Sequence, residues 1–445
     1  GSKAPIASLA DRISAVFVPA VMALAVLSGL GWLFAGAGAP FALKIFTAVL
    51  VIACPCAMGL ATPMSIMVAT GRGAALGVLI KSGEALQAAG SAGVAVFDKT
   101  GTLTHGRPVL AELVLARGTS LTEAKIITLA AGAESRSEHP LAQAVLAAAQ
   151  ERGLAIPVPE SFLAQPGQGV EAVVTGRTVR LGNAGFAGQA FVDGALAGEV
   201  TRLSESGMTP LCLSVDGSPA AILAVADTLR DETPGVLAAL KRQGVRVVML
   251  TGDNERTAWA IAQRAGLERG DVIAGVLPDG KAEVIAGLKR ELEGTGRTVV
   301  MVGDGVNDAP ALALADVGIA MGGGPQPADS HSAGGRTSGA HSFGSDAAIE
   351  SGDVVLMHTL SSTEGNGGTL TGVLAALALS KAAMRNIRQN LFWAFAFNVI
   401  GIPVAAGLLF AFGGPTLNPM LAGTAMGLSS VTVVTNALRL RFFKP

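Results

Sequence analysis

Seven consecutive residues, 98–104, carry the side chains best suited to covalent chemistry. They read Asp-Lys-Thr-Gly-Thr-Leu-Thr and follow the apolar run at residues 94–97. An apolar run that breaks into Asp, Gly and Thr indicates a buried parallel strand ending in a tight turn, and open α/β sheets bind ligands at such strand ends. A carboxylate placed there can attack the γ-phosphorus of ATP if a metal ion and a cation cancel the charge repulsion. We therefore expect Asp98 to be a nucleophile that forms an aspartyl phosphate.

Two later strands deliver polar groups to the same sheet edge. Residues 247–253 read Val-Val-Met-Leu-Thr-Gly-Asp, and residues 299–308 read Val-Val-Met-Val-Gly-Asp-Gly-Val-Asn-Asp. Each is an apolar strand that ends in hydroxyl or carboxylate groups. Between them, Pro-Asp-Gly-Lys at residues 278–281 opens a helix. Phosphoryl transfer requires carboxylates for Mg²⁺, a cation for the phosphoryl group and donors for its oxygens, and these segments supply all three.

The heptapeptide and the later motifs, in this order, resemble the P-type ATPases, whose phosphorylated aspartate lies in that heptapeptide. The resemblance extends over nearly the whole chain. It implies a haloacid-dehalogenase-like, doubly wound α/β phosphorylation domain, an inserted α+β nucleotide-binding domain and α-helical transmembrane segments. It also implies an enzyme that couples ATP hydrolysis to ion transport.

The resemblance assigns a role to each strand-end residue. It implies that Asp98 accepts the phosphoryl group and that Lys281 and Thr251 hold the phosphoryl oxygens. Asn307 and Asp308 are implied to support these residues. The implied Mg²⁺ ligands are Asp98, the backbone carbonyl of Thr100, and Asp304.

Thr100 separates a pump from a phosphatase. Phosphatases of the same fold family carry a second aspartate two residues after the nucleophile, which acts as general acid and base. Here that position is Thr100, so rapid hydrolysis within the site is disfavoured. A transport cycle needs such a lasting phosphoenzyme, because the stored energy must drive a conformational change before water enters.

Residues 112–225 form the expected inserted domain, which should hold the nucleotide. Its motifs resemble the nucleotide domain of the heavy-metal branch of the family, with one departure at Ala172, where a further Gly often follows. The resemblance implies that Glu134 and His139 contact adenine and that the glycines let the backbone approach the nucleotide. The implied nucleotide-binding residues are Glu134, His139, Gly167, Gly169, Gly182 and Asn183.

The composition predicts membrane spans. Half of the 445 residues are apolar and only 15% are charged. Residues 13–43 and 389–438 contain no charge, and the segment from about 41 to 71 carries only Lys44. These stretches predict four transmembrane helices in two hairpins. Basic residues flank both hairpins on the side of the polar insert, so the positive-inside rule places the insert and both termini in the cytoplasm.

Charge and cysteine usage exclude other classes. The formal net charge is −1, which gives no reason to expect a nucleic-acid partner. The three cysteines are an odd, sparse set and do not form a disulfide framework, and no cleavable signal peptide opens the chain. The expected partner is membrane lipid, and the resemblance implies an integral protein of a bacterial plasma membrane.

Cys54-Pro55-Cys56 lies inside the second predicted span. Proline removes a helix hydrogen bond and kinks the span, so both sulfurs can face one cavity. Thiolates are soft ligands that favour Cu(I) and also accept Zn²⁺. Asn398, Met426 and Ser430 resemble the copper-transporting subgroup, which implies that they complete a Cu(I) path fed by a chaperone or thiol donor. Phe397 departs from that subgroup, which usually has Tyr there.

A zinc or cadmium pump is the nearest alternative. No carboxylate lies in any predicted span, whereas a pump for a divalent ion would be expected to place a charged partner there. The sequence therefore favours copper(I) export and leaves the zinc or cadmium function open.

The expected domains follow the chain in five segments. A membrane hairpin with Cys-Pro-Cys occupies residues 1–84, and a second hairpin occupies 379–445. The phosphorylation domain takes residues 85–111 and 226–378, around the nucleotide-binding domain at 112–225. A Gly- and Ser-rich stretch at 324–343 interrupts the family pattern and is expected to be a disordered loop.

One family element is not found in the sequence. No Thr-Gly-Glu occurs, so the actuator domain and its dephosphorylating glutamate are expected to be missing. This leaves turnover by the chain alone open. It also leaves a third function open, that of a non-pumping, membrane-anchored binder of nucleotide and metal.

Overall fold

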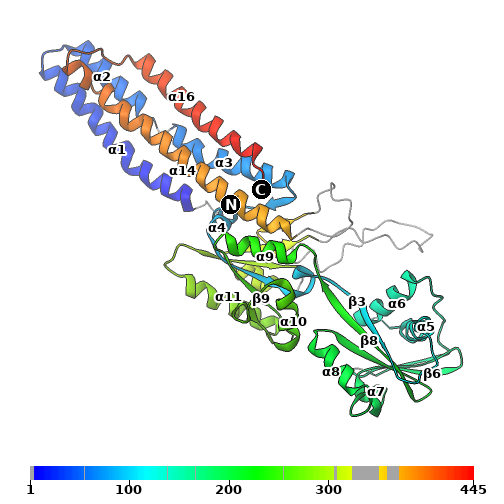
Figure 1. The fold of residues 1–445 in the computed structure, drawn as a ribbon. Coiled ribbons are helices and arrows are strands. Elements are labelled where there is room, and N and C mark those ends of the chain that lie inside the picture. The colour runs from blue at the N-terminus through cyan, green and yellow to red at the C-terminus, as the bar shows by residue number, and fades with distance from the viewer. Residues whose placement is uncertain are drawn as a thin grey trace.

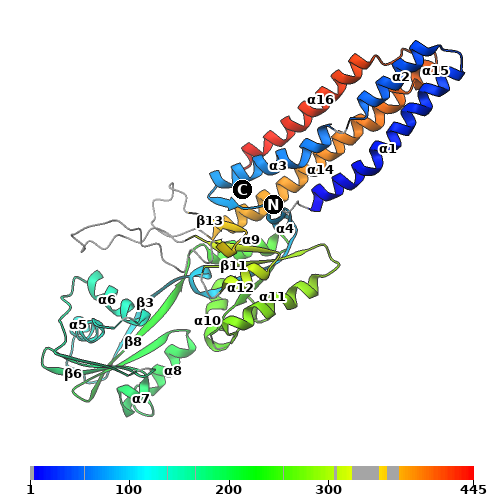
Figure 2. The ribbon, with the colours of Figure 1, turned by 180° about the vertical axis from the view of Figure 1, so that it is seen from behind.

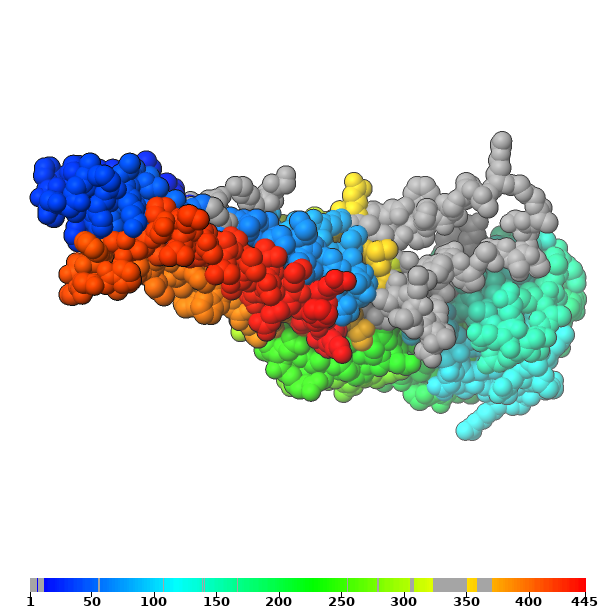
Figure 3. Space-filling view, turned by 90° about the horizontal axis from the view of Figure 1, so that it is seen from above, coloured from blue at the N-terminus to red at the C-terminus, as the bar shows by residue number. Residues whose placement is uncertain are grey.

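The computed structural model describes residues 5–54, 56–137, 139–165, 167–253, 255–304, 308–322, 350–357 and 370–445. Pro55, Asn307 and the predicted loop at 324–343 lie outside these residues, and the side chain of Cys56 is likewise not described. Figure 1 shows a bundle of long helices, an α/β layer against one end of it, and a second sheet farther out. Figure 3 shows that the molecule is elongated, with the N-terminal helices at one end and the second sheet at the other.

The bundle contains the four predicted spans. Within the described residues, four segments are long and apolar enough to cross a membrane, which confirms the expected number. These segments are Arg12–Phe34, Ala39–Ala75, Thr371–Ala411 and Pro419–Phe442. Their helices are α1 (Pro5–Phe34), α2 (Ala39–Ile52), α3 (Cys56–Ala75), α14 (Thr371–Ala405), α15 (Leu408–Ala411) and α16 (Pro419–Leu438).

The second span contains a break. We expected one kinked helix through Cys54-Pro55-Cys56, but α2 ends at Ile52 and α3 begins at Cys56. Proline has no N–H to donate and its ring clashes with the preceding turn, so it favours a helix start over a helix interior. The break leaves Cys54 between two helices, half-buried.

Sheet A has seven strands in the order β1-β13-β12-β11-β2-β9-β10. All neighbours are parallel except β1, which runs antiparallel to β13 at the edge. The strands are β1 (Val78–Ile80), β2 (Ala92–Asp98), β9 (Arg246–Leu250), β10 (Val272–Ile273), β11 (Thr298–Gly303), β12 (Val317–Met321) and β13 (Val354–Leu356). Every residue of β2 is buried, as its continuous apolar run predicts.

Helices cover both faces of sheet A, which makes it doubly wound as predicted. Ala95 and Phe97 of β2 point into one core, and Val94 and Val96 point into the other, because successive strand residues alternate between faces. The helices are α4 (Gly83–Gly90), α9 (Thr233–Arg242), α10 (Glu255–Ala265), α11 (Pro278–Leu292) and α12 (Ala309–Leu314). The first core also includes Ala69 of α3 and Leu379 of α14, so the membrane helices pack directly on the sheet. Figure 2 shows α14 running along the bundle to this layer.

Sheet B is a six-stranded antiparallel sheet in the order β3-β8-β7-β6-β5-β4. Its strands are β3 (Thr104–Leu115), β4 (Ser161–Gln165), β5 (Gly169–Val174), β6 (Arg177–Gly182), β7 (Thr209–Val215) and β8 (Ser218–Leu229). One face packs on α5 (Glu123–Glu134) and α6 (Pro140–Glu151), and the other on α7 (Ala184–Ala187) and α8 (Ala197–Glu205). The strands β3 and β8 also connect the two sheets (Figure 1), so the boundaries expected near residues 111 and 225 fall inside them.

Candidate active site

Asp98 is the last residue of β2, the strand at the centre of the site. Its neighbours in the sheet are β9 and β11, which end just before Thr251 and Asp304. Because parallel strands end at the same edge, the three motifs meet there. Carboxylate oxygens of Asp98, Asp304 and Asp308 lie within 4.8 Å of one another. The structure thus brings together residues that are more than 200 positions apart in the sequence.

Lys281 joins two of these carboxylates. Its Nζ lies 2.5 Å from Oδ1 of Asp98 and 2.7 Å from Oδ1 of Asp308. It lies in the first turn of α11, where the free backbone N–H groups of a helix add positive potential. Asp98, Lys281 and Asp308 are all buried, so water screens these charges little.

The backbone that follows Asp98 holds its carboxylate in position. The second oxygen of Asp98, Oδ2, accepts a hydrogen bond of 3.0 Å from the backbone N–H of Thr100. Gly101 follows with φ of 73°, and a Cβ placed on it would lie 1.5 Å from Oδ2 of Asp304. The half-buried Lys99 pairs with Asp253 at 2.6 Å. Thr251, buried beside them, accepts a hydrogen bond from the backbone N–H of Asp253.

The site holds more negative charge than its cation neutralises. Burial and the nearby carboxylate of Asp308 raise the pKa of Asp98 to about 6, although Lys281 opposes the rise. Burial and the charges of Asp98 and Asp308 raise the pKa of Asp304 to about 7. Burial lowers the pKa of Lys281, but the two carboxylates outweigh it and keep that pKa above its usual value. A further cation bound here would therefore reduce the repulsion between the carboxylates.

The donor set fits Mg²⁺. Carboxylate and carbonyl oxygens are the hard ligands that this ion prefers. Asp98, Asp304 and Asp308 supply carboxylates at suitable spacing, and their mutual repulsion would be relieved by a divalent ion. Asp98, Asp304 and the backbone carbonyl of Thr100 remain the predicted ligands.

The predicted nucleotide residues lie on sheet B, on its connecting turns and at the ends of the helices that cover it. Glu134 ends α5, and its Oε2 is buried without a hydrogen-bond partner among the described residues. Burial raises the pKa of Glu134. His139 caps α6, its Nδ1 accepting from the backbone N–H of Leu141 at 3.2 Å. An orphaned buried carboxylate oxygen beside a histidine suits a ligand that donates hydrogen bonds, as the amino group of adenine does.

Glycines allow close packing between β5 and β6. Gly169 and Gly182 face each other across β5 and β6, and a Cβ on Gly169 would lie 2.6 Å from Cα of Gly182. Asn183 caps α7 and also donates from Nδ2 to the carbonyl of Gly167 at 3.2 Å. Gly167 has φ of 72° and open space around it. Asn183 therefore holds the Gly167 turn, and Gly167 is the position at which a ligand can approach the backbone.

Three of the predicted copper residues, Asn398, Met426 and Ser430, lie on α14 and α16. Met426 and Asn398 are buried, and Met426 packs in the same cluster as Ile52, the last residue of α2 before the cysteine segment. Oδ1 of Asn398 is buried without a partner among the described residues. Ser430 is half-buried and donates to the carbonyl of Met426 at 3.3 Å. Its neighbour Ser429 is fully buried and has an unpartnered hydroxyl in the described structure.

Comparison with known proteins first identifies the segment between the two pairs of apolar helices. Residues 93–316, half of the chain, match the family described as haloacid dehalogenase-like hydrolase. The chain belongs to the haloacid dehalogenase-like hydrolase family. The fold predicted from the strand-end motifs is therefore confirmed.

Similarity to curated and solved proteins extends beyond this domain. The chain is 48% identical over 448 residues to copper-transporting ATPase 1 of Rhizobium meliloti (strain 1021), an alignment that covers 100% of the chain and 50% of that protein. It is 45% identical over 445 residues to a probable copper-exporting P-type ATPase V of Mycobacterium tuberculosis (strain ATCC 25618 / H37Rv), covering 100% and 52%. The crystal structure of a zinc-transporting PIB-type ATPase in the E2.Pi state superposes with a TM-score of 0.79 and 35% identity, covering 97% of the chain and 63% of that structure.

These matches confirm the resemblance to heavy-metal P-type ATPases. The chain spans about half the length of the curated relatives that it matches. Copper transporters stand among the sequence relatives and a zinc transporter among the solved structures.

A buried polar cluster in the bundle was missed from the sequence. Oγ of Ser65 donates to Oδ1 of Asn386 at 2.9 Å and accepts from Nδ2 of Asn390 at 3.0 Å. Asn436 donates to Oδ1 of Asn390 at 2.8 Å. These contacts join α3, α14 and α16 close to the haloacid dehalogenase-like domain. Nothing in the spacing of three asparagines on two distant helices indicated that they meet.

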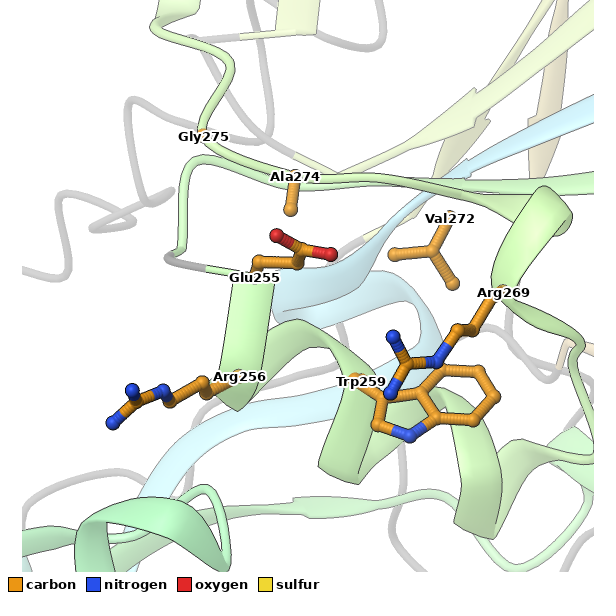
Figure 4. A pocket seen from close by; sticks show the side chains of 7 residues that line it. All are labelled: Glu255, Arg256, Trp259, Arg269, Val272, Ala274 and Gly275. Atoms are coloured by element: carbon orange, nitrogen blue, oxygen red, sulfur yellow. The ribbon is translucent and has the colours of Figure 1, made fainter.

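A pocket of about 540 Å³ opens beside α10 (Figure 4), on the haloacid dehalogenase-like domain. The guanidinium of Arg269 lies over the ring of Trp259, 5.2 Å from its centroid. Glu255 and Arg256 line the same pocket, just beyond Asp253 of the active-site edge. Among the described residues, none of the predicted phosphoryl-transfer or nucleotide residues lines it.

Proposed function

We propose that this chain is the catalytic and C-terminal membrane portion of a P-type ATPase that exports copper(I) through an aspartyl phosphate. The observation that carries the proposal is the buried contact of Lys281 with Asp98 at the end of β2. A carboxylate held by a cation, beside two further carboxylates, is equipped to accept a phosphoryl group. The same chain carries membrane helices with soft ligand atoms.

The residues support transfer as follows. A carboxylate oxygen of Asp98 forms a bond to the γ-phosphorus of ATP while the bond from that phosphorus to the bridging oxygen breaks, and ADP leaves with the electron pair. Lys281 reduces the repulsion between Asp98 and the phosphate, and the backbone N–H of Thr100 orients the nucleophile. Thr251 lies at the same edge and supplies a hydroxyl for the phosphoryl oxygens. When bound, Mg²⁺ would supply further charge neutralisation at Asp98, Asp304 and Thr100.

The nucleotide would be held by sheet B. Glu134 and His139 would receive the adenine, and the Gly167 turn, held by Asn183, would lie against the nucleotide. The orphaned Oε2 of Glu134 supports this role, because a buried charged oxygen without a partner is costly and a bound ligand can satisfy it.

Copper(I) is the cargo that the membrane residues favour. In their reduced forms, Cys54 and Cys56 would supply thiolates at the break between α2 and α3, and Met426 would supply a thioether near that break. Soft sulfur ligands select Cu(I), and no Asp or Glu lies in the four apolar segments to balance a divalent ion. Asn398 and Ser430 would add oxygen donors along the path. We infer delivery by a thiol or chaperone donor, because Cu(I) exchanges readily between thiolates.

The orientation follows from charge. Arg72, Arg385, Arg388 and Arg439 all lie at the end of the bundle that meets sheet A, whereas Lys44 lies at the far end beside Thr416. By the positive-inside rule the two sheets and both termini would be cytoplasmic, in a bacterial plasma membrane.

The test is phosphorylation of the detergent-solubilised chain by radiolabelled ATP with Cu(I), with Zn²⁺ or with neither. Acid-stable label that Asp98→Asn abolishes and that Cu(I) increases is the expected result. An increase with Zn²⁺ alone would favour a zinc or cadmium pump. Absence of label under all conditions would favour a non-pumping binder of nucleotide and metal.

A further inference from the structure

Arg230 lies at the junction between the two sheets, directly after β8. Its side chain is only 8% exposed and points under the loop that follows Asp98. Nη2 donates to the carbonyl of Gly101 at 2.9 Å, and Nε donates to the carbonyls of Thr102 and Thr104 at 3.0 and 3.1 Å. The backbone N–H of Arg230 donates to the carbonyl of Leu103 at 3.0 Å. One residue therefore binds four consecutive carbonyls of the phosphoryl-acceptor loop.

The loop needs such a partner because it is not regular. Thr100 and Gly101 have non-helical backbone angles, and residues 101–104 are buried. Buried carbonyls without partners are costly, and this segment cannot pair them within itself. A guanidinium offers five donors in a planar fork and stays charged, so it can bind several carbonyls in fixed directions. A lysine ammonium would present one point of contact.

Asp227, three residues before Arg230, completes the contact from the same strand. Its Oδ2 accepts from the hydroxyl of Thr104 at 2.5 Å, and its Oδ1 accepts from the backbone N–H of Gly106 at 2.9 Å. The ladder between β3 and β8 is interrupted between Thr104 and Pro108. The side chain of Asp227 thus replaces missing ladder bonds at the point where the chain leaves the active site for sheet B.

We propose that Arg230 and Asp227 are positioning residues that hold the acceptor loop, residues 99–106, from the connection between the two sheets. The loop contains Thr100, whose N–H binds Asp98, and Gly101, which packs against Asp304. A shift of the loop would displace both carboxylates. The geometry of the predicted metal ligands is consequently tied to the position of β8, and through β8 to the nucleotide-binding sheet. The inference rests on the proposed phosphoryl transfer to Asp98.

The test compares Arg230→Gln, Arg230→Lys and Arg242→Gln in the full chain in detergent. Arg242 is an exposed arginine at the end of α9 and serves as the matched control. Three quantities are measured without turnover: amide hydrogen exchange of residues 99–106, binding of Mn²⁺ by electron paramagnetic resonance, and affinity for a fluorescent ATP analogue. Asp304→Asn identifies the Mn²⁺ signal that belongs to this site.

For Arg230→Gln we expect hydrogen exchange in the loop to rise about tenfold, because local opening becomes easier. Mn²⁺ binding should weaken about 10- to 100-fold, the usual cost of losing a residue that orients metal ligands. Affinity for the ATP analogue should stay within about twofold, because sheet B keeps its own core. Arg230→Lys should fall between Arg230→Gln and the wild type, and Arg242→Gln should match the wild type.

Wild-type loop exchange and Mn²⁺ affinity in both Arg230 variants would overturn the proposal. A second result would also overturn the proposal. In it, Arg230→Gln would lose nucleotide binding as strongly as Mn²⁺ binding, which indicates general destabilisation, and Arg230→Lys would keep wild-type exchange in the loop. Failure of the proposed function has a different signature: the wild type would take no label from ATP, while the exchange and Mn²⁺ measurements would still report on the loop.

Discussion

Lys281 lies with its Nζ 2.5 Å from Oδ1 of Asp98, although 183 residues separate them in the sequence. Both side chains are buried, and the same ammonium also contacts Asp308. The lysine is therefore part of the charge balance of the site before any phosphate arrives, and it does not have to move to meet the substrate.

Replacing Lys281 by methionine should slow phosphorylation by about 100- to 1,000-fold, the typical loss for a preorganised group that stabilises charge in the transition state. The measurement is the rate of acid-stable labelling by radiolabelled ATP. Lys289→Met is the control, because Lys289 lies two turns later on α11 and pairs with Asp316 near the surface. Equal labelling rates in the two variants would contradict the role given to Lys281.

Replacing Gly101 by alanine should disable the site, because the new Cβ would lie 1.5 Å from Oδ2 of Asp304. A displacement of about 1 Å at reacting groups costs about 100-fold in rate, so labelling should fall at least that far. Gly118→Ala separates this clash from backbone strain: Gly118 has φ of 86° but nothing within 4 Å of the new Cβ. Labelling by Gly118→Ala should match the wild type, and an equal loss in both would implicate strain alone.

Thr100→Asp should shorten the life of the phosphoenzyme. Thr100 supplies no general base, and positioned acid–base help is worth about 100- to 10,000-fold in rate. The wild-type label should therefore decay slowly after a chase with unlabelled ATP, and the Thr100→Asp label should decay faster by a factor in that range. Thr100→Ser keeps a hydroxyl and should behave as the wild type. Fast multiple turnover by the wild type would show that a dephosphorylating group exists elsewhere in the chain.

Glu134 gives a pH-dependent prediction. Burial raises the pKa of Glu134 above the ordinary 4.5, so the nucleotide-free native state favours the protonated form more than the unfolded state does. That contribution to stability is complete below pH 4.5 and is lost as the pH rises through the raised value. Glu134→Gln should therefore raise the melting temperature at pH 7.5 and leave it unchanged at pH 4, when both are measured without nucleotide.

The same Glu134→Gln variant should bind ATP more weakly at pH 7.5. Loss of a hydrogen bond to a charged group costs about 1.5–3 kcal/mol, which is about 10- to 150-fold in affinity. Glu123→Gln, at the exposed start of α5, is the control for both measurements. Unchanged ATP affinity in Glu134→Gln would remove this residue from the nucleotide site.

Cu(I) stoichiometry in detergent tests the cysteine pair. The Cys54→Ser, Cys56→Ser double variant should lose bound Cu(I), because serine hydroxyls are poor ligands for a soft ion. Cys212→Ser should bind as the wild type does, since Cys212 is buried in β7 and burial raises its pKa to about 12, so that it is not a thiolate. Equal Cu(I) binding by the wild type and the double variant would exclude the proposed site.

The sheet and its catalytic edge could be predicted because a change from apolar to polar residues marks the end of each strand. The runs that precede Asp98, Thr251 and Asp304 are apolar and short, and parallel strands share an edge, so the three residues had to meet. The four spans were predictable for a similar reason, as long uncharged stretches have few alternatives.

Contacts to the backbone could not be predicted. Arg230 binds carbonyl oxygens, which every residue has, so no spacing or residue type marks its partners. The asparagines of α14 and α16 posed the same difficulty, because their meeting depends on how two helices are rotated about their axes. The start of α14 at Thr371 was also hidden, since its first turns carry Lys381 and Arg385 and pack on sheet A instead of lipid.

The antiparallel edge strand β1 has a mechanical consequence. It follows α3 after a short turn and is hydrogen-bonded to β13, and residues of α3, α14 and β2 share one core that includes Phe97, the neighbour of Asp98. These described residues pack in one core, so we expect sheet A, α3 and α14 to move as one rigid unit. The 20 residues of α3 span about 30 Å, and a tilt of sheet A by about 10° would swing the cysteine end of α3 by about 5 Å. Phosphorylation of Asp98, if it tilted sheet A, would therefore cause a larger displacement at the proposed copper site.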